Sequence, residues 1–190
     1  MIRVRDLIVR FDSVTALTMP ALDIDQGEHV GIHGPNGSGK TTLMRVLAGL
    51  QEPSQGSVLG APPPGRTVLV HQRPYLLRGT AAENVAYALK LHGRSPAEAG
   101  SWLERLGVSH IADRRANALS GGEHRRVVIA RALAVEPEVL LLDEPFVALD
   151  EEGLETVNAA IAAFEGTIVI AAPDDLHDLD LRTVELQGSW

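Results

Sequence analysis

The spacing of apolar residues predicts that the chain begins with strands and then enters a helix through a glycine-rich stretch. Alternating apolar and polar residues in 2–11 (IRVRDLIVRF) and 21–25 (ALDID) predict two short strands. A turn at Gly27 then leads into the apolar run HVGIH at 29–33. Beyond the glycines that follow, the apolar residues of 42–50 (TLMRVLAGL) recur at helical spacing. The first fifty residues therefore have the order strand, glycine loop, helix.

The middle of the chain is predicted to be almost entirely helical. A proline-rich turn at 61–65 precedes a buried strand at 67–71 (TVLVH). Residues 80–135 contain almost no strand signal and predict helices over 81–91, 96–106 and 121–135. We interpret this region as a helical layer inserted into the domain.

Strands and helices alternate again toward the C-terminus. VLLLD at 139–143 and TIVIAA at 167–172 are buried strands, with a helix from about 151 to 164 between them. A short acidic helix and the strand TVEL at 183–186 follow. This alternation predicts an α/β fold with a mostly parallel sheet that has helices on both faces. We expect one domain, 1–190, with a core of about 1–75 and 136–190 and a helical subdomain of about 76–135.

Charged residues are unevenly distributed along the chain. Their distribution limits the kinds of molecule that the chain can bind. The net charge of −8 disfavours broad nucleic-acid binding, because nonspecific affinity comes mostly from basic groups that release counterions. Residues 1–135 carry 16 basic and 11 acidic side chains, a net of +5, while 136–190 carry 1 and 14, a net of −13. Only the first part is suited to hold an anion.

The amino-acid composition excludes several further classes of protein and of binding site. With no cysteine there is no disulfide framework, thiolate nucleophile or Cys-type zinc site, which fits a reducing cytoplasm. We expect no signal peptide, because charged residues interrupt the N-terminus, and no membrane span, because Glu165-Gly166 breaks the most apolar stretch. The histidines have no ligand-like spacing, so we expect no histidine metal site.

The glycine loop matches a phosphate-binding motif. Residues 34–41 satisfy G-x-x-x-x-G-K-[ST] between an apolar strand and an amphipathic helix, the context that the motif requires. In such a loop, backbone N–H groups surround the phosphates, Lys40 reaches the β and γ phosphates, and the Thr41 hydroxyl joins a magnesium shell. The alternative is a glycine-rich turn with an accidental Lys-Thr. The predicted nucleotide-binding residues here are Gly34, Asn36, Gly37, Ser38, Gly39, Lys40, Thr41 and Thr42.

Two acidic residues follow the buried strand VLLLD and supply the groups that a magnesium nucleotide needs. Asp143 is expected to hold the metal, and Glu144 is placed to polarise the water that attacks the γ phosphate. The alternative is a buried strand that ends in two solvated acids. The phosphate loop upstream favours the catalytic interpretation and a P-loop NTPase fold.

Together these motifs resemble the ATP-binding cassette of ABC transporters over nearly the whole chain. LSGGE at 119–123 resembles the signature of this family and opens the helix that carries RRVVIARAL. Gln72 follows the strand VLVH, and ALD at 148–150 resembles the D-loop. The motifs stand in the order of the family. The resemblance implies an α/β P-loop fold with N-terminal antiparallel strands and an inserted helical subdomain.

The resemblance also implies an ATPase that uses ATP and Mg²⁺ in a head-to-tail dimer of two cassettes. Ser120, Gly121 and Gly122 would contact the ATP of the partner, although a serine N-cap followed by two glycines is also an ordinary helix start. Phe11 would stack on adenine, and Gln72 would contact the metal. Catalysis would then rest on Glu144, Gln72 and Lys40, and the metal on Thr41, Gln72 and Asp143.

The sequence departs from the family after the strand TIVIAA. The family usually has a histidine there that touches the γ phosphate, but this chain has Pro173, which has neither a side-chain donor nor a backbone N–H. His177 lies four residues later. We therefore expect slow hydrolysis by the isolated chain. The chain is also shorter than most members of the family, with a clipped segment after Pro173.

Three functions remain open on the sequence alone. The first is an energy-coupling ATPase for an importer, possible cargoes being oxyanions, bound through Tyr75–Asn84 to separate membrane permease subunits on the cytoplasmic face of the membrane. The second is a nucleotide-gated dimerising module in which hydrolysis is vestigial because of Pro173. The third, a soluble DNA-repair or ribosome-associated cassette, is disfavoured by the acidic balance and by the lack of coiled-coil insertions.

Overall fold

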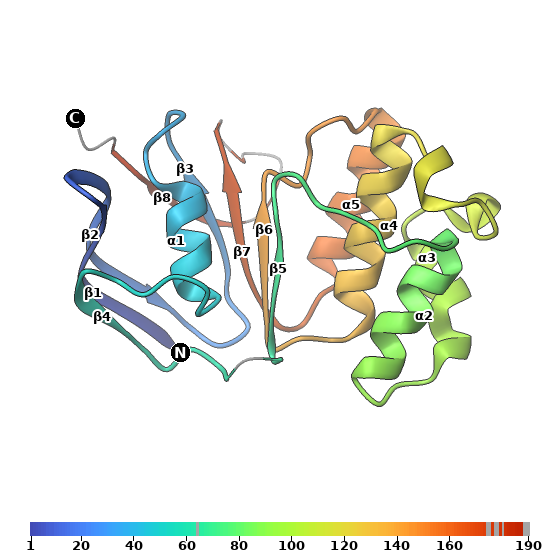
Figure 1. Ribbon diagram of the computed structural model, residues 1–190, viewed down its shortest axis with the longest axis horizontal. Coiled ribbons are helices and arrows are strands. Elements are labelled where there is room, and N and C mark those ends of the chain that lie inside the picture. Colours follow the sequence, from blue (N-terminus) through green and yellow to red (C-terminus); the bar gives the residue numbers. More distant parts are fainter. Residues whose placement is uncertain (64, 174–175, 177–178, 180, 188–190) are drawn as a thin grey trace. The chain divides into compact units, whose positions relative to one another are not determined.

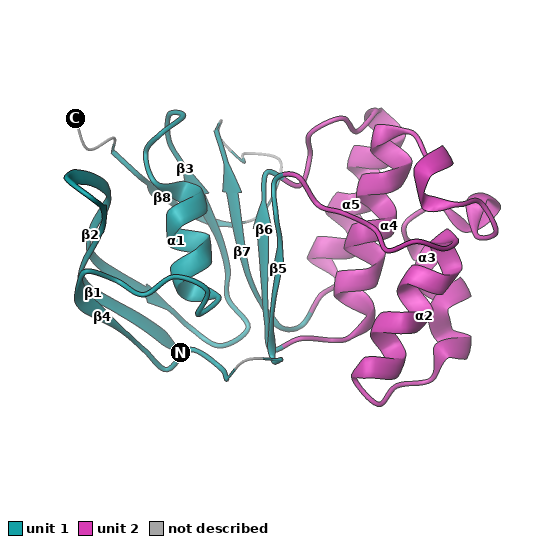
Figure 2. Cartoon of the chain, viewed as in Figure 1, with its two compact units in different colours: residues 1–72, 138–144, 165–190 teal, residues 73–137, 145–164 magenta. Residues whose placement is uncertain are grey.

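The computed structural model describes residues 1–63, 65–173, 176, 179 and 181–187. They form two compact units (Figures 1 and 2), unit 1 with residues 1–72, 138–144 and 165–190, and unit 2 with residues 73–137 and 145–164. No helix in these described ranges is long and apolar enough to span a bilayer.

Unit 1 begins with a three-stranded antiparallel sheet in the order β2-β1-β4. Its strands are β1 (Ile2–Phe11), β2 (Val14–Ile24) and β4 (Gln55–Leu59). The buried residues of β1 change from even to odd positions at Asp6, where the backbone takes a φ of 47°. The β1–β4 register shifts at the same place, between Arg5 and Ile8. The irregularity keeps apolar side chains of both halves of β1 on the core side.

The second sheet of unit 1 is parallel and carries the predicted motifs at one edge. Its order is β5-β6-β7-β3-β8, with β5 (Thr67–Val70), β6 (Val139–Asp143), β7 (Thr167–Ala172), β3 (His29–His33) and β8 (Arg182–Glu185). Every residue of β6 and β7 is buried, and all of them except Asp143 and Thr167 are apolar. Because all the pairs are parallel, the carboxyl ends of the strands meet at the same edge of the sheet.

Helix α1 (Lys40–Leu47) joins the two sheets into one core. It packs on β2 of the antiparallel sheet and on β6 and β7 of the parallel sheet (Figure 1). Its buried Leu43, Met44, Val46 and Leu47 belong to the same apolar cluster as residues of both sheets. Burial of these side chains fixes the start of the helix, and with it the glycine loop, against the sheet.

Unit 2 is helical and contains α2 (Ala81–Leu91), α3 (Ala99–Arg105), α4 (Gly121–Ala134) and α5 (Glu151–Ala162). Helix α2 packs on α3 and α4, and α4 also packs on α5. The N-termini of α2 and α4 have the same reciprocal capping arrangement, Thr80 with Glu83 and Ser120 with Glu123. The first residues of α2 and α4 are therefore fixed by the sequence around each N-terminus.

The structure differs from the sequence-based expectations in three places. Strand β4 was not predicted, and the segment predicted as a helix over 96–106 is a 3₁₀ turn at Pro96–Glu98 followed by the short α3. Helix α5 was expected in the core subdomain but belongs to unit 2, because it packs on α4. The short acidic helix expected after Pro173 lies largely outside the described residues, as does His177.

Candidate functional site

The glycine loop lies where β3 ends and α1 begins, and its lysine is folded over it. Lys40 is 6% exposed, and its Nζ donates to the carbonyl oxygens of Gly34, at 2.5 Å, and Pro35, at 3.0 Å. These two bonds hold the ammonium group inside the loop. Asn36 and Gly37 are exposed, so the loop is open to solvent at its tip. A phosphate group can reach it there.

Two glycines of the loop are required by neighbouring backbone. Gly39 takes a φ of 98°, and a Cβ at this position would lie 2.6 Å from the carbonyl oxygen of Ala16 on β2. Gly34 takes a φ of 147°, and a Cβ there would overlap the carbonyl oxygen of Leu186. The loop conformation thus depends on residues that lack a side chain, as phosphate loops require.

Asp143 and Thr41, two of the residues predicted to hold a metal, lie within hydrogen-bonding distance of each other. Thr41 Oγ1 donates to Asp143 Oδ2 at 2.8 Å, although the two residues are distant in sequence. Asp143 is 1% exposed, and no described residue hydrogen-bonds to its Oδ1. The hydroxyl of buried Ser38 likewise lacks a partner among the described residues. A buried carboxylate oxygen without a partner, beside a hydroxyl, fits a hard cation such as Mg²⁺.

Burial raises the pKa of Asp143 above its ordinary value of 3.8, and the neighbouring charge of Glu144 adds to the effect, whereas the bond from Thr41 opposes it. The folded nucleotide-free chain therefore keeps the proton of this carboxyl up to a higher pH than the unfolded chain does. A raised pKa means that the carboxyl contributes stability below about pH 3.8, and that this contribution is lost as the pH rises through the raised value. At neutral pH, the charge of Asp143 destabilises the chain unless a cation is bound.

Asp143→Asn should consequently raise the melting temperature of the nucleotide-free, metal-free chain at pH 7, by about 2–4 °C for each kcal/mol gained. The gain should shrink as the pH falls, because the parent carboxyl then takes up its proton as well. Thermal melts in a chelator between pH 4 and 8 measure the effect. Asp12→Asn, at an exposed turn, is the matched control. A melting-temperature difference from the parent that does not change with pH would contradict the assignment.

Glu144 has a strained backbone and a side chain held by Gln72. Its φ is 51°, an uncommon conformation for a residue with a side chain, and its N–H donates to the carbonyl of Ala171 at 2.8 Å. Gln72 Nε2 donates to Glu144 Oε2 at 2.6 Å. Strand register explains this contact. Val70 of β5 pairs with Leu142 of β6, and Gln72 and Glu144 each lie two residues beyond that pair.

Phe11 lies at the end of β1 and is 46% exposed, opposite the exposed Val14 of β2. It is therefore not part of the apolar core, which was the alternative for a single Phe at a strand end. An exposed ring is available to cover a flat base.

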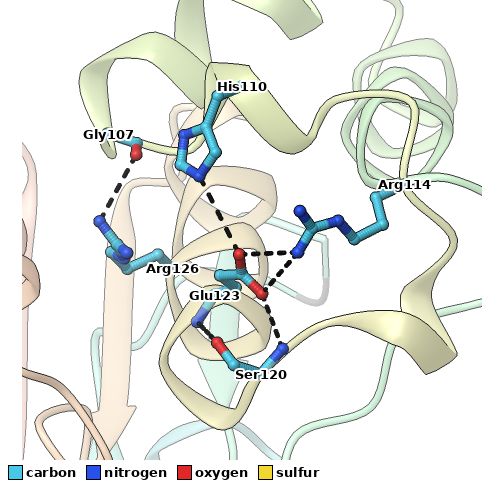
Figure 3. Close-up of polar contacts among 6 residues, drawn as sticks. All are labelled: Gly107, His110, Arg114, Ser120, Glu123 and Arg126. Atoms are coloured by element: carbon cyan, nitrogen blue, oxygen red, sulfur yellow. Dashed lines mark hydrogen bonds and ion pairs between the residues drawn. The ribbon is translucent and has the colours of Figure 1, made fainter.

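In unit 2, the signature residues open α4 beside the ALD turn. Ser120 Oγ accepts from the N–H of Glu123 at 3.2 Å, and Glu123 Oε2 accepts from the N–H of Ser120 at 2.7 Å (Figure 3). The Ser120 N–H holds the pKa of Glu123 low, with smaller contributions from the Ser120 hydroxyl and Arg114. Since the Ser120 oxygen accepts, its hydroxyl hydrogen can still be donated to a ligand.

Gly122 fits closely against the ALD turn. A Cβ at Gly122 would lie 2.9 Å from the carbonyl oxygen of Ala148, and Ala148 itself takes a φ of 65°. Absence of a side chain at 122 therefore lets the start of α4 contact the turn. Ser120, Gly121 and Gly122 belong to unit 2, whereas the other predicted site residues belong to unit 1.

Sequence reasoning missed the two residues that fix the segment after Gln72. Asn84, buried on α2, accepts from the N–H of Leu77 at 2.7 Å and donates to the carbonyls of Leu77 and Thr80. Arg131 of α4 donates to the carbonyl of Tyr75 at 2.9 Å and lies over the Tyr75 ring. A single Asn among the apolar residues of a predicted helix was the available signal for Asn84.

This arrangement has clear counterparts among known proteins. The family model described as ABC transporter matches residues 17–147. The chain belongs to the ABC transporter family. This confirms the resemblance inferred from LSGGE, Gln72 and VLLLDEP, and it is consistent with the order of the motifs along the chain.

Relatives of this ABC chain include import proteins. It is 41% identical to the sulfate/thiosulfate import ATP-binding protein CysA of Bordetella pertussis, covering 93% of this chain and 55% of CysA. It is 36% identical to the tungstate uptake system ATP-binding protein TupC of Peptoclostridium acidaminophilum, covering 94% of this chain and 88% of TupC. The chain spans about half the length of the CysA relatives that it matches.

Solved structures confirm that the fold is that of an ABC ATPase domain. The ATP-binding cassette MJ0796, solved as a dimer in a post-hydrolysis state with ADP and Pi, superposes with a TM-score of 0.87 at 27% identity over 99% of this chain and 95% of that chain. The cbiO1 protein of Clostridium perfringens, part of an ABC transporter complex, gives a TM-score of 0.77 at 29% identity over 91% of this chain and 78% of that chain. The predicted α/β P-loop fold is therefore correct.

Proposed function

We propose that this chain binds ATP with Mg²⁺ and hydrolyses it to drive the import of a solute through separate membrane subunits. The observation that carries the proposal is the convergence of Lys40, Thr41, Asp143, Glu144 and Gln72 at one edge of the parallel sheet of unit 1. Membership of the ABC transporter family supports the choice of ATP over another phosphate compound.

The phosphates of ATP bind in the loop over 34–42. Backbone N–H groups at the start of α1 and the ammonium of Lys40 face their negative charge. Thr41, Asp143 and the side-chain oxygen of Gln72 would hold Mg²⁺, which would supply positive charge to the phosphates when bound. Phe11 covers the adenine.

Hydrolysis depends on Glu144. Its carboxylate accepts a proton from the water whose oxygen bonds to the γ phosphorus, while the bond from that phosphorus to the β,γ-bridging oxygen breaks. Glu144 directly follows β6, at the edge of the sheet that carries the loop, and takes a φ of 51°. Lys40 balances the charge that develops on the phosphate oxygens.

Two copies, or this chain and a similar one, bind two ATP molecules head to tail. Ser120, Gly121 and Gly122 of one copy then contact the γ phosphate held by the other copy, offering a hydroxyl, close backbone approach and a helix N-terminus. The dimeric state of the similar MJ0796 cassette supports this arrangement. ATP closes the dimer and hydrolysis reopens it.

The permease subunits bind unit 2 near Tyr75–Asn84 and hold the chain at the cytoplasmic face of the membrane. An open pocket of about 570 Å³ supports this placement, with Tyr75, Leu77, Arg78, Arg115 and His124 among its lining residues. Tyr75 is exposed while Arg131 and Asn84 fix the backbone around it, so the surface is preformed. Such a surface suits a short helical segment of another protein.

The imported solute is proposed to be an oxyanion. Sulfate, thiosulfate and tungstate in the names of the CysA and TupC relatives support this class. Pro173 favours a second candidate function, a dimerising module with weak hydrolysis, because position 173 offers no donor to the γ phosphate.

One purification tests the proposal. The tagged chain, isolated from detergent-solubilised membranes of its native cell, should carry an integral membrane protein, and the complex should hydrolyse ATP in the presence of Mg²⁺. Lys40→Ala should keep the complex and lose hydrolysis. Tyr75→Ala combined with Arg78→Ala should lose the complex but leave ATP turnover by the isolated chain intact. A soluble particle without a membrane protein would contradict the transport role.

A further inference from the structure

A negatively charged side chain lies at the helix start that is proposed to contact a phosphate group. Glu123 stands in the first turn of α4, three residues after Ser120. Its side chain is 15% exposed, and the bond from the Ser120 N–H holds its pKa below the ordinary value of 4.5, so it is a carboxylate at neutral pH. A helix N-terminus carries only about half of a positive charge, so one carboxylate there outweighs it. The start of α4 therefore needs a compensating positive charge if it is to hold a γ phosphate.

Arg114 supplies this positive charge. Its Nη1 donates to Glu123 Oε1 at 3.0 Å and to Oε2 at 3.3 Å (Figure 3). Because Oε2 also accepts from the N–H of Ser120 at 2.7 Å, the carboxylate joins the arginine to the backbone of the serine. His110 Nε2 lies 4.0 Å from Oε1 and adds positive charge only when it is protonated. The pair of Arg114 and Glu123 is neutral as a whole.

The backbone of Arg114 is fixed within unit 2. Its N–H donates to the carbonyl of Ile111 at 2.9 Å, and its carbonyl accepts from the N–H of Ala81, the first residue of α2, at 3.0 Å. The side chain of Arg114 is 47% exposed, and an ion pair with so exposed a partner contributes little to stability. Stability of the fold therefore does not account for the pair, whereas the charge at the start of α4 does.

We propose that Arg114 is a positioning residue for Ser120, which it prepares for the partner's ATP by neutralising Glu123. The neutralised carboxylate holds the N–H of Ser120 through Oε2. The Ser120 hydroxyl and the N–H groups of Gly121 and Gly122 then meet the γ phosphate without a competing negative charge. This inference rests on the proposed function, because it takes Ser120 to contact the ATP that the second copy holds.

Dimerisation with ATP and Mg²⁺, measured by sedimentation, tests this role. Every chain carries Glu144→Gln as the reference, so that hydrolysis does not reopen the dimer. Arg114→Ala should raise the dimer dissociation constant about 10- to 100-fold, because an uncompensated carboxylate then faces each of the two ATP molecules. Arg114→Lys should stay within about threefold of the reference, since a single nitrogen makes both contacts in the parent. The monomer should bind ATP with an affinity within about twofold of the reference, because Arg114 belongs to unit 2 and the phosphate loop to unit 1.

Removal of the Glu123 charge separates neutralisation from a structural role. Glu123→Gln keeps a side-chain oxygen for the N–H of Ser120 but carries no charge. In the presence of Glu123→Gln, Arg114→Ala should change the dimer dissociation constant by no more than about threefold. Higher salt should also reduce the effect of Arg114→Ala on its own, because ions screen the repulsion between the carboxylate and the phosphate.

Arg105→Ala is the matched control, because it removes an exposed arginine of the same unit that lies over the Trp102 ring. It should leave the dimer dissociation constant unchanged. The inference is overturned if Arg114→Ala dimerises like the reference, or if it weakens the dimer equally in the presence and in the absence of Glu123→Gln. A reference chain that forms no dimer with ATP would instead contradict the head-to-tail arrangement itself, and the inference with it.

Discussion

A Glu144→Gln chain should bind ATP with Mg²⁺ as tightly as the parent and hydrolyse it about 100- to 10,000-fold more slowly. Glutamine keeps the size of the side chain and an oxygen facing the water, but it cannot take up the proton, and loss of a general base costs this range. Gln72 loses its charged acceptor in the same variant. The rate should be measured by single turnover, so that product release does not hide the chemical step.

ATP should also hold the Glu144→Gln chain in the dimer, because the step that reopens it is removed. Sedimentation or size-exclusion chromatography with ATP and Mg²⁺ measures this, and the parent should return to its nucleotide-free state as ATP is consumed. Glu165→Gln is the matched control, since it changes the same charge at an exposed position of unit 1. Hydrolysis by Glu144→Gln at the parent rate would remove Glu144 from the role of base.

Pro173→His should raise the rate of hydrolysis by about 100-fold. Position 173 directly follows β7, and its neighbour Ala172 pairs with His33 immediately before the phosphate loop. A histidine here adds one donor to the charge that develops on the γ phosphate, and a single donor of this kind is commonly worth about 100-fold or more. This comparison also separates the two candidate functions.

Pro173→Ala is the control for the histidine variant, because it frees the backbone without adding a donor. We expect Pro173→Ala to resemble the parent. If the parent already hydrolyses ATP as fast as Pro173→His, the missing histidine does not limit turnover and the weak-hydrolysis alternative is wrong. If both are slow and both still dimerise with ATP, the dimerising module is favoured.

The parts of the site that are continuous in sequence were predictable from the sequence. The loop at 34–41 and the strand before Asp143 each follow from local pattern, because glycines, an apolar run and helical spacing occur within a few residues of one another. Strand β4 was not predictable in this way. Its sequence QGSVL has a glycine and little alternation, and it is a strand because its backbone pairs with β1.

Contacts between distant residues were the part that the sequence did not reveal. Nothing near Gln72 indicates that it meets Glu144, since the meeting depends on the register of β5 and β6. Helix α5 was assigned to the wrong part of the chain for a related reason, because its place depends on its packing against α4. The unpartnered oxygen of Asp143 also became visible only once burial was known.

The close fit of Gly122 on the carbonyl of Ala148 affects how this surface binds a second subunit. The start of α4 and the ALD turn lie close enough that a side chain at position 122 would displace one of them. A partner therefore encounters one rigid edge instead of two loops that must each be ordered on arrival. Association then loses less conformational entropy, so that more of the free energy of ATP binding is available for closing the two copies.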